Sequence, residues 1–390
     1  MLELIFWGML LLLFYTYLGY PLALMILNKI PSIDLNQKKN LKTDRLPIVS
    51  ILIAAYNEEK VIADKIENCL KLDYPIRNYN IWIASDGSSD RTNEIVKNYA
   101  VKNEKIHLLE FPRIGKAMVL NKAMSDIKSE IVVFSDANTE FKADVLKNLV
   151  RRFKDRRIGC VCGRLVYRNP TKGISGVSES AYWRYETALK KMESKVGYVS
   201  GANGAIYAIR RELFEPLSAR TINDDFEISM KIVKGGFRCI YEEQAIAYED
   251  VAPAMKSEFK RHVRDGAGHY IAVINLIGLL NPFIGIRSFI YWSHRIFRWS
   301  APFLLILLLI LNIVLLDREL YKNFLILQLS FYFFAIAGWI SIQNMKNRRI
   351  PFFMYVPFYF CNLNTALLLG FFKAVTGMQK TTWERTERIG

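Results

Sequence analysis

Hydrophobic residues divide the chain into three parts. An uncharged apolar run from Leu4 to Leu27 is long enough to cross the hydrocarbon core of a bilayer. Most of the charged residues lie in the central part, and long apolar segments return beyond position 298. We therefore expect an N-terminal membrane helix (1–28), a basic linker (29–47) and a central domain (48–275), followed by further membrane segments.

The central part alternates short apolar runs with helical patterns. A first run, Ile48–Ala55, leads into a polar turn and a predicted helix over Val61–Leu70. Similar runs at Ile81–Ala84, Ile106–Leu109 and Ile131–Phe134 are each followed by polar residues and another helical pattern. Strands that alternate with helices in this way predict an α/β fold with a doubly wound sheet and helices on both faces.

Two oxygen-bearing side chains, Asp136 and Asn138, follow the fourth predicted strand. In an open α/β sheet, the ligand-binding crevice lies beyond the carboxyl ends of the strands. Carboxylate and amide oxygens suit a hard cation such as Mg²⁺ or Mn²⁺, so the two residues are candidate metal ligands. The alternative is that Asp136 caps the next predicted helix, which begins at Phe141.

The net charge of +16 suits either nucleic acid or an anionic membrane surface. Much of this charge flanks the apolar segments, and the sequence has neither a zinc-finger spacing nor an Arg-rich helix. We therefore expect membrane lipids, and no nucleic acid, as partners. Basic residues between Lys29 and Arg45 follow the first apolar run, so the positive-inside rule puts the central domain in the cytoplasm. The pattern predicts a multi-pass protein of the cytoplasmic membrane.

The last third of the chain combines membrane-spanning and interfacial patterns. Residues 276–298 mix apolar side chains with Arg287 and Arg295, which predicts an amphipathic helix lying in the membrane interface. Two membrane helices are expected within 299–342. Basic residues flank the apolar segment 351–373 on both sides, so this segment is either re-entrant or a third C-terminal crossing.

An ordered set of motifs runs through the central domain. They are Ala54-Ala55-Tyr56-Asn57-Glu58, Ser85-Asp86-Gly87-Ser88-Ser89-Asp90, Gly115-Lys116, Asp136-Ala137-Asn138, Gly201-Ala202-Asn203-Gly204-Ala205 and Asn223-Asp224-Asp225. In this order they resemble family 2 glycosyltransferases, in particular the membrane-bound branch that includes cellulose, hyaluronan and poly-N-acetylglucosamine synthases. The resemblance covers residues 48–270 and the C-terminal tail. It implies a GT-A fold with a mixed sheet and a nucleotide-sugar donor, usually linked to UDP.

The resemblance also implies roles for residues on the donor side. The base and ribose would be held by Ala54, Tyr56, Glu58 and Asp86. Lys116 would lie near the diphosphate, and Asp136 with Asn138 would bind the metal. From the residues alone, Tyr56 could equally pack the end of a strand, and Lys116 could begin a solvated helix.

The chain departs from the family at two donor-side positions. Ser85 and Asn138 stand where the family commonly has acidic residues. An amide oxygen can still bind Mg²⁺ but brings no charge. Metal binding is therefore expected to rest mainly on Asp136.

Residues on the acceptor side follow in the second half of the domain. The resemblance implies that the acceptor is approached by Asn203, Gly204, Asp224, Arg261 and Arg264. It makes Asp225 the catalytic base, whereas Asp224 could instead cap the helix that the pair opens. Asp265 stands where processive relatives carry the Trp of a Gln-x-x-Arg-Trp motif, so the aromatic surface for the acceptor sugar is missing.

The C-terminal tail, 374–390, resembles the gating segment of these synthases. Its matching residues are Trp383, Thr386 and Arg388. A disordered amphipathic tail is the alternative interpretation.

The sequence thus predicts an inverting, metal-dependent glycosyltransferase that uses a UDP-sugar and works in polysaccharide synthesis. One alternative is the addition of a single sugar to a polyprenyl- or lipid-linked acceptor. Another is a non-catalytic scaffold in a polysaccharide secretion complex. A homo-oligomer or an assembly with secretion-complex subunits is compatible with either enzyme.

Overall fold

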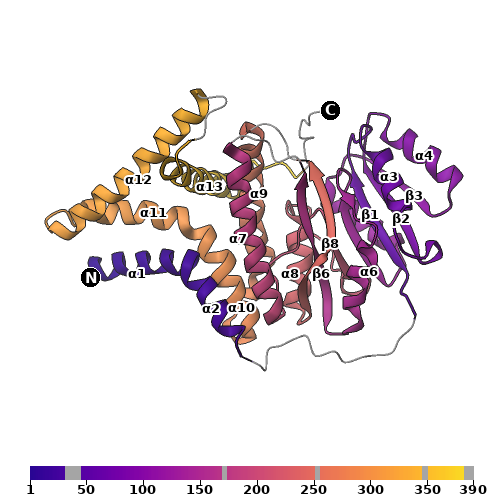
Figure 1. Ribbon diagram of the computed structural model, residues 1–390, viewed down its shortest axis with the longest axis horizontal. Coiled ribbons are helices and arrows are strands. Elements are labelled where there is room, and N and C mark those ends of the chain that lie inside the picture. The colour runs from indigo at the N-terminus through magenta and orange to yellow at the C-terminus, as the bar shows by residue number, and fades with distance from the viewer. Residues whose placement is uncertain (31–44, 169–173, 251–254, 345–349, 382–390) are drawn as a thin grey trace.

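The computed structural model of the protein describes residues 1–30, 45–168, 174–250, 255–344 and 350–381. A domain built on a β-sheet lies on one side of the molecule, and long helices project from its other side (Figure 1). Helices α7 (Ile174–Val196) and α9 (Met255–Asn275) lie between the sheet and the projecting helices.

The described residues form a mixed sheet in the order β3-β2-β1-β4-β7-β6-β8-β5. Its strands are β1 (Val49–Ala55), β2 (Tyr79–Asp86), β3 (Ile106–Phe111), β4 (Ile131–Asp136), β5 (Glu140–Phe141), β6 (Ile158–Arg168), β7 (Tyr207–Arg210) and β8 (Arg238–Asp250). Strands β3, β2, β1 and β4 are mutually parallel, whereas β7 runs antiparallel to its neighbours β4 and β6. The carboxyl ends of β1, β2 and β4 therefore meet at one edge, which is where the sequence predicts the site.

Helices cover both faces of the sheet because the central strands are apolar on both sides. All seven residues of β1 are buried. Alternate residues such as Ile51 and Ile53 pack under α3 (Ile62–Leu70), α4 (Thr92–Lys102) and α6 (Val145–Val150). The other residues pack against α5 (Lys116–Asp126) and α8 (Asp224–Lys234). The predicted fold class, a mixed doubly wound sheet of GT-A type, is confirmed.

The segment after β4 differs from the prediction. Asp136 is the last residue of β4 and does not cap a helix. The helix expected from Phe141 begins only at Val145 and has Asp144 at its N-cap, because Phe141 pairs with β8 as part of the short strand β5. Asp136 therefore ends its strand at the edge of the sheet where the sequence predicts the site.

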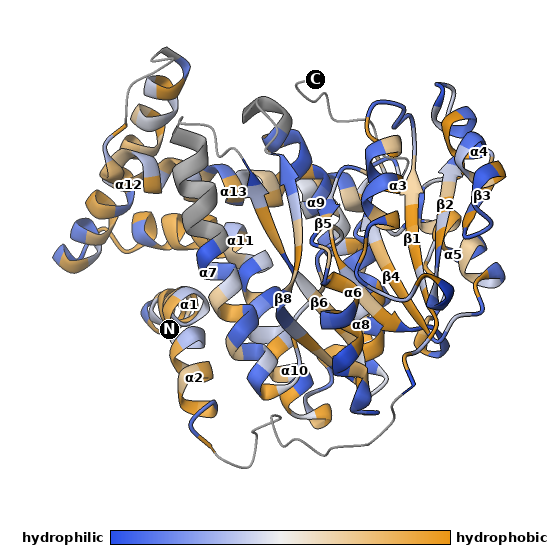
Figure 2. Cartoon of the chain, turned by 45° about the vertical axis from the view of Figure 1, so that its right-hand side comes forward, coloured by the Kyte–Doolittle hydropathy of each residue, from blue (hydrophilic) through white to orange (hydrophobic). Residues whose placement is uncertain are grey.

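Within the described residues, four helices are long and apolar enough to cross a membrane. The first, Leu2–Leu27, comprises α1 (Leu2–Phe14), a π-helical turn and α2 (Tyr20–Leu27). The second, Ile286–Val314, comprises α10 (Ile286–Ile290), a second π-helical turn and α11 (Phe297–Val314). The others lie within α12 (Glu319–Asn344) and α13 (Phe352–Val375). Figure 2 shows that hydrophobic residues predominate along these helices and in the centre of the sheet.

The second of these helices departs from the boundary expected at residue 298. Short 3₁₀ turns at Ile277–Leu280 and Pro282–Ile284 are followed by one uninterrupted helix that begins at Ile286. Two polar residues of the stretch 276–298 contact other parts of the protein. Arg295 donates to the carbonyl of Ser200, and His294 is fully buried.

The projecting helices are joined to one another and to the domain. Helix α13 packs along α9 so closely that a Cβ atom on Gly370 would lie 2.6 Å from the amide nitrogen of Ala267. Glu3, at the start of α1, pairs with Arg318 in the turn after α11, with 2.6 Å between the charged atoms. The N-terminus and this turn therefore lie at the same end of the helices.

Candidate active site

Asp86 organises the loop on the donor side of the crevice. It ends β2, and its side chain is fully buried. One carboxylate oxygen accepts hydrogen bonds from the amides of Ile114 (2.7 Å) and Gly115 (2.9 Å), and the other pairs with Arg113 (2.5 Å). Gly115 has a φ of +89°, which favours glycine, and it directly precedes α5. The carboxylate thus fixes the turn from which Lys116 projects.

Arg113 was not among the predicted site residues. Its side chain covers the ring of Tyr56, which was predicted to contact the donor. Its guanidinium carbon lies 3.2 Å from the ring centroid of Tyr56. The side chain of Asp86 pairs with the same guanidinium, so the structure brings both predicted donor residues together through Arg113. The only sequence signal was its place just before Gly115-Lys116.

Ala54 and Glu58 lie on the same side of the sheet edge. Ala54 lines the crevice beside Lys116. Glu58 is buried, and its amide donates to the hydroxyl of Thr92 at 2.8 Å, which ties the loop after β1 to the loop after β2. Ser85 is buried beneath this region, and its hydroxyl contacts that of Ser88 at 3.0 Å.

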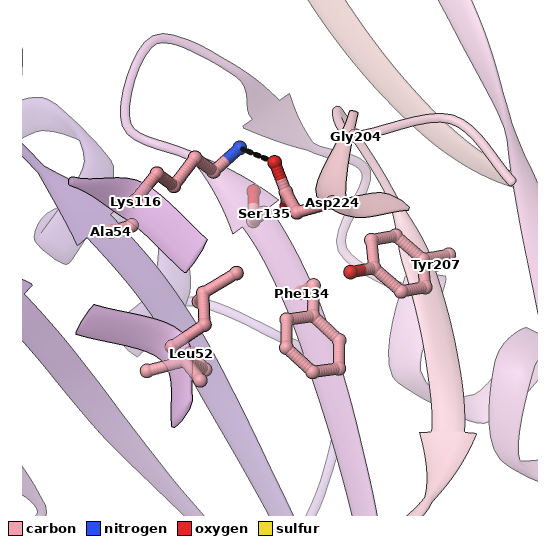
Figure 3. A pocket seen from close by; sticks show the side chains of 9 residues that line it. Leu52, Ala54, Lys116, Phe134, Ser135, Gly204, Tyr207 and Asp224 are labelled. Atoms are coloured by element: carbon pink, nitrogen blue, oxygen red, sulfur yellow. Dashed lines mark ion pairs between the residues drawn. The ribbon is translucent and has the colours of Figure 1, made fainter. Parts of the chain in front are cut away.

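The ammonium of Lys116 bridges two carboxylates from different elements. Its Nζ lies 3.2 Å from Oδ1 of Asp136, at the end of β4, and 3.2 Å from Oδ1 of Asp224, at the start of α8. Figure 3 shows the contact with Asp224 across the crevice. Burial on its own would lower the pKa of Lys116, but the two carboxylates outweigh it and raise that pKa. The ammonium therefore stays charged and holds the cluster together.

Asp224 was expected either near the acceptor or as a helix cap. The N-cap of α8 is Asn223, and the carboxylate of Asp224 contacts Lys116, so the capping alternative is wrong. Burial raises the pKa of Asp224 above its usual value. The residue belongs to the charged cluster.

Asp225 faces the crevice next to Gly204. Its Oδ1 accepts a hydrogen bond from the amide of Phe226 at 2.8 Å. A Cβ atom on Gly204 would lie 3.4 Å from Oδ2 of Asp225 and 3.5 Å from Oδ2 of Asp136. Burial, with a smaller contribution from the charge of Asp224, raises the pKa of Asp225 to about 6. A carboxylate with such a pKa is suited to accept a proton near neutral pH.

Asn138 is turned toward a partner that the sequence did not suggest. Its amide nitrogen donates to Oε1 of Glu249, on β8, at 2.7 Å. Only the amide oxygen is then suited to bind a cation. Among the residues that the structure describes, no group of three or more His, Cys, Asp or Glu side chains is arranged to bind a metal.

The residues present nevertheless fit a cation that completes its coordination with substrate. The carboxylate of Asp136 faces the space beside Gly204, and the amide of Asn138, whose nitrogen is held by Glu249, follows two residues later. Mg²⁺ and similar ions are commonly held by one or two carboxylates together with substrate phosphates. The donor set at the end of β4 is of this kind.

A buried lysine supports the loop that follows β4. Lys65, on α3, donates from Nζ to the hydroxyl of Ser135 and to the carbonyl of Thr139, each at 2.7 Å. Its burial lowers its pKa to about 8. The sequence signal was a lysine on the apolar face of a predicted helix, three residues after Ile62 and one before Ile66.

The crevice contains one further polar group. Tyr207, on β7, stacks on Phe134 with 4.6 Å between the ring centroids. Its hydroxyl points into the crevice (Figure 3), and it has no hydrogen-bond partner among the described residues. Burial raises the pKa of this hydroxyl well above its usual value, so it remains protonated and able to donate.

Residues expected on the acceptor side come from the loop before β7 and from α9. Asn203 accepts a hydrogen bond from the amide of Ala205 at 3.1 Å, which shapes the loop before β7. Arg264 pairs with its neighbour Asp265 at 3.2 Å, and Arg261 lies one turn earlier on α9. The carbonyl of Asp265 accepts from Asn223 at 3.0 Å, so α9 borders the start of α8.

Trp383, Thr386 and Arg388 of the expected gating tail lie outside the described residues. The chain does approach the site just before them. A Cβ atom on Gly115 would lie 3.6 Å from the carbonyl oxygen of Thr381. The C-terminal segment therefore reaches the start of α5.

The amino-acid sequence is similar to those of known proteins. Residues 50–217 match the family described as Glycosyl transferase family 2. The chain is 28% identical over 242 residues to the beta-monoglucosyldiacylglycerol synthase of Trichormus variabilis, a match that covers 60% of this chain and 52% of that protein. It is 27% identical over 239 residues to the poly-beta-1,6-N-acetyl-D-glucosamine synthase of Staphylococcus aureus, covering 60% and 58% respectively. The chain thus spans about half the length of the curated relatives it matches.

A solved structure has a similar fold over almost the entire chain. It is the mannosyltransferase PcManGT of Pyrobaculum calidifontis in complex with GDP-Man and Mn²⁺. The TM-score is 0.67 at 20% sequence identity, and the match covers 96% of this chain and 99% of that one. Residues 50–217 thus match a family 2 glycosyltransferase domain, and this match supports the predicted enzyme class.

Proposed function

We propose that the protein is an inverting, metal-dependent glycosyltransferase that moves a sugar from a nucleotide sugar, most simply a UDP-sugar, to a glycan at the cytoplasmic face of the membrane. One observation carries the proposal. The cationic Lys116 and the carboxylates of Asp136 and Asp225 converge on the crevice at the carboxyl ends of the parallel strands. These are the charges that the transfer requires, at the edge where such sheets bind ligands.

The donor would lie along the ends of β1 and β2. Its base and ribose would contact Ala54, Tyr56, Glu58 and Asp86. Arg113 lies on Tyr56 and must share this surface with the base or move from it. Lys116 would then contact the diphosphate, where its positive charge stabilises the negative charge that develops as the sugar leaves.

Asp225 would act as the base. Its carboxylate would accept the proton of the acceptor hydroxyl while that oxygen attacks the anomeric carbon and the bond to the diphosphate breaks. A single displacement of this kind inverts the anomeric configuration. Asp224 would keep Lys116 in place, and Gly204, which has no side chain, would let the reacting sugar approach Asp225.

Asp136 and the amide oxygen of Asn138 would hold Mg²⁺ or Mn²⁺. When bound, such an ion neutralises charge on the leaving diphosphate. Asp136 contributes the negative charge of the pair, and Glu249 fixes the amide of Asn138.

The membrane segments support a cytoplasmic orientation of the domain. The pair between Glu3 and Arg318 puts the N-terminus and the turn after α11 at one end of the helices. With basic residues after α2, we place this end outside and the residues 48–275 in the cytoplasm. Helix α13 either crosses the membrane or returns to the same side. The described chain reaches the start of α5 at Thr381, and the resemblance assigns contacts with the nucleotide to Trp383, Thr386 and Arg388, which lie outside the described residues.

A lipid-linked acceptor that receives a single sugar is the second candidate. It is favoured by Asp265, which replaces the aromatic residue of processive relatives and pairs with Arg264. That pair leaves no aromatic platform at this position for a growing polysaccharide. The cluster of Lys116 with Asp136 and Asp224 favours catalysis over the scaffold alternative, because it supplies charges that the transfer requires.

Product analysis tests the proposal. The full-length protein in detergent would be supplied with Mn²⁺ or Mg²⁺ and a panel of UDP- and GDP-sugars, with and without a lipid acceptor. We expect nucleotide release that requires the metal and disappears in Asp225→Asn. A long product from one sugar supports the glycan acceptor, whereas extension by one sugar only with added lipid supports the second candidate. Absence of nucleotide release under all these conditions contradicts both.

A further inference from the structure

The carboxylate of Glu193 lies at the junction between the N-terminal membrane helix and the catalytic domain. It is fully buried near the end of α7. The hydroxyl of Tyr20, on α2, donates to its Oε1 at 2.6 Å, and Nδ1 of His294 lies 2.5 Å from the same oxygen. The amide of Ser200 donates to Oε2 at 2.9 Å. Three separate parts of the chain therefore meet at one side chain.

A buried glutamate such as Glu193 is unusual at a junction between two parts of a protein. A buried carboxylate is costly unless hydrogen bonds and opposite charge compensate. Burial on its own would raise the pKa of Glu193, but His294 and the hydrogen bonds from Tyr20 and Ser200 outweigh it and lower that pKa. The carboxylate is thus a strong acceptor whose geometry is set by its donors.

Ser200 begins the loop that leads to the active site. Its carbonyl accepts a hydrogen bond from Nε of Arg295 at 2.8 Å. The next residue, Gly201, has a φ of +106°, and a Cβ atom there would lie 2.6 Å from a ring carbon of Phe226. The loop therefore passes in close contact with the residue that follows Asp225.

Hydrogen bonds continue from this loop to the proposed base. The amide of Ala202 donates to the hydroxyl of Ser229 at 2.9 Å, and that hydroxyl contacts the carbonyl of Asp225 at 2.8 Å. Gly204, at the end of the loop, lies next to the carboxylate of Asp225. An unbroken path of contacts thus runs from Tyr20 to Asp225.

We propose that Glu193 is a positioning residue for sugar transfer, through which the N-terminal membrane helix sets the loop Ser200–Gly204 beside Asp225. This inference rests on the proposed function. The membrane helix then affects the geometry of the acceptor side in addition to anchoring the domain in the membrane. Because Tyr56 and Asp86 lie at other strand ends, nucleotide binding does not depend on this path.

Paired tyrosine substitutions in the full-length protein test the inference. Tyr20→Phe removes only the hydroxyl that contacts Glu193, and Glu193→Gln keeps the shape of the side chain. The matched control is Tyr15→Phe, because Tyr15 lies on the same continuous helix and its hydroxyl contacts Ser293 at 2.8 Å instead. Hydrogen–deuterium exchange would follow the amides of Ser200 and Ala202, and kinetics would give kcat for transfer and the affinity for UDP.

We expect faster exchange of the loop amides and a kcat about tenfold lower in Tyr20→Phe and in Glu193→Gln, because small displacements of reacting groups are costly. UDP affinity should be unchanged, and Tyr15→Phe should resemble the wild type. Unchanged loop exchange, or a parallel loss of UDP affinity, or an equal effect of Tyr15→Phe would overturn the inference. If the wild type transferred no sugar, the proposed function would fail, whereas the exchange data would still show whether Tyr20 orders the loop.

Discussion

Nζ of Lys116 lies at the same distance, 3.2 Å, from the carboxylates of Asp136 and Asp224. Lys116→Ala removes the ammonium that bridges them and leaves these carboxylates and Asp225 to repel one another. We expect kcat/KM for sugar transfer to fall about a hundredfold, since charge stabilisation at the diphosphate is lost as well. Steady-state kinetics with a nucleotide-release assay would measure the effect.

Lys122→Ala is the matched control for this substitution. Lys122 lies on the same helix, α5, but it is exposed. Its removal should leave kcat/KM at the value of the wild type. Equal losses in both variants would show that Lys116 acts through helix stability and not through the cluster.

Removing the proposed base should abolish turnover without abolishing donor binding. Asp225→Asn keeps the size of the side chain and an oxygen that can accept the hydrogen bond from Phe226, but the amide cannot take a proton. We expect kcat to fall by about 10²–10⁴-fold, the usual range for the loss of a general base. Nucleotide affinity, measured by calorimetry, should stay close to that of the wild type. Transfer at a near-normal rate would remove Asp225 from this role.

The pH dependence of kcat/KM should reflect the same carboxylate. Burial and the charge of Asp224 raise the pKa of Asp225 to about 6, and only the ionised form can accept a proton. Activity should therefore decline as the pH falls through about 6. In Asp224→Asn one negative charge is gone, which lowers the pKa of Asp225 and should move the acid limb of the profile to lower pH. An acid limb that stays in place would show that another group controls it.

The sequence predicted the sheet well because its strands and turns carry local signals. The apolar runs ending at Ala55 and Phe134 are buried on both faces, which fixes their place in the centre of the sheet. The antiparallel strand β7 and the long strand β8 could not be placed, because their positions depend on partners distant in the sequence.

In the site, too, local sequence signals could be read, whereas contacts between distant residues could not. The structure assembles Lys116, Asp136, Asp224 and Asp225 as neighbours, but their roles remain predictions. Arg113, Lys65 and Glu249 were missed because each acts through a side chain from another element. A short motif cannot specify such tertiary contacts, although the lysine on an apolar helix face was a local sign of one.

Lys65 should support metal binding from beneath the loop. Lys65→Met fills a similar volume but leaves the hydroxyl of Ser135 and the carbonyl of Thr139 without this donor. We expect the apparent affinity for Mn²⁺ to fall about tenfold, in the range found when supporting hydrogen bonds of metal ligands are removed. A titration of activity against Mn²⁺ would measure it. The exposed residue Lys71, which follows the same helix, provides the control substitution Lys71→Met.

The contact between Asn138 and Glu249 suits an amide at position 138 better than an acid. Nδ2 of Asn138 donates to Glu249 at 2.7 Å, and an aspartate at position 138 would put two carboxylates face to face. Asn138→Asp alone should therefore weaken metal activation, because like charges at this distance force one carboxyl to keep its proton.

Glu249→Gln supplies a neutral donor for the new carboxylate. The double variant should bind Mn²⁺ more tightly than the wild type, since the site gains a charged ligand. Titrations of activity against Mn²⁺ for the four proteins of this cycle would give the coupling between the two positions. Additive effects would mean that the charge of Glu249 does not determine the residue at position 138.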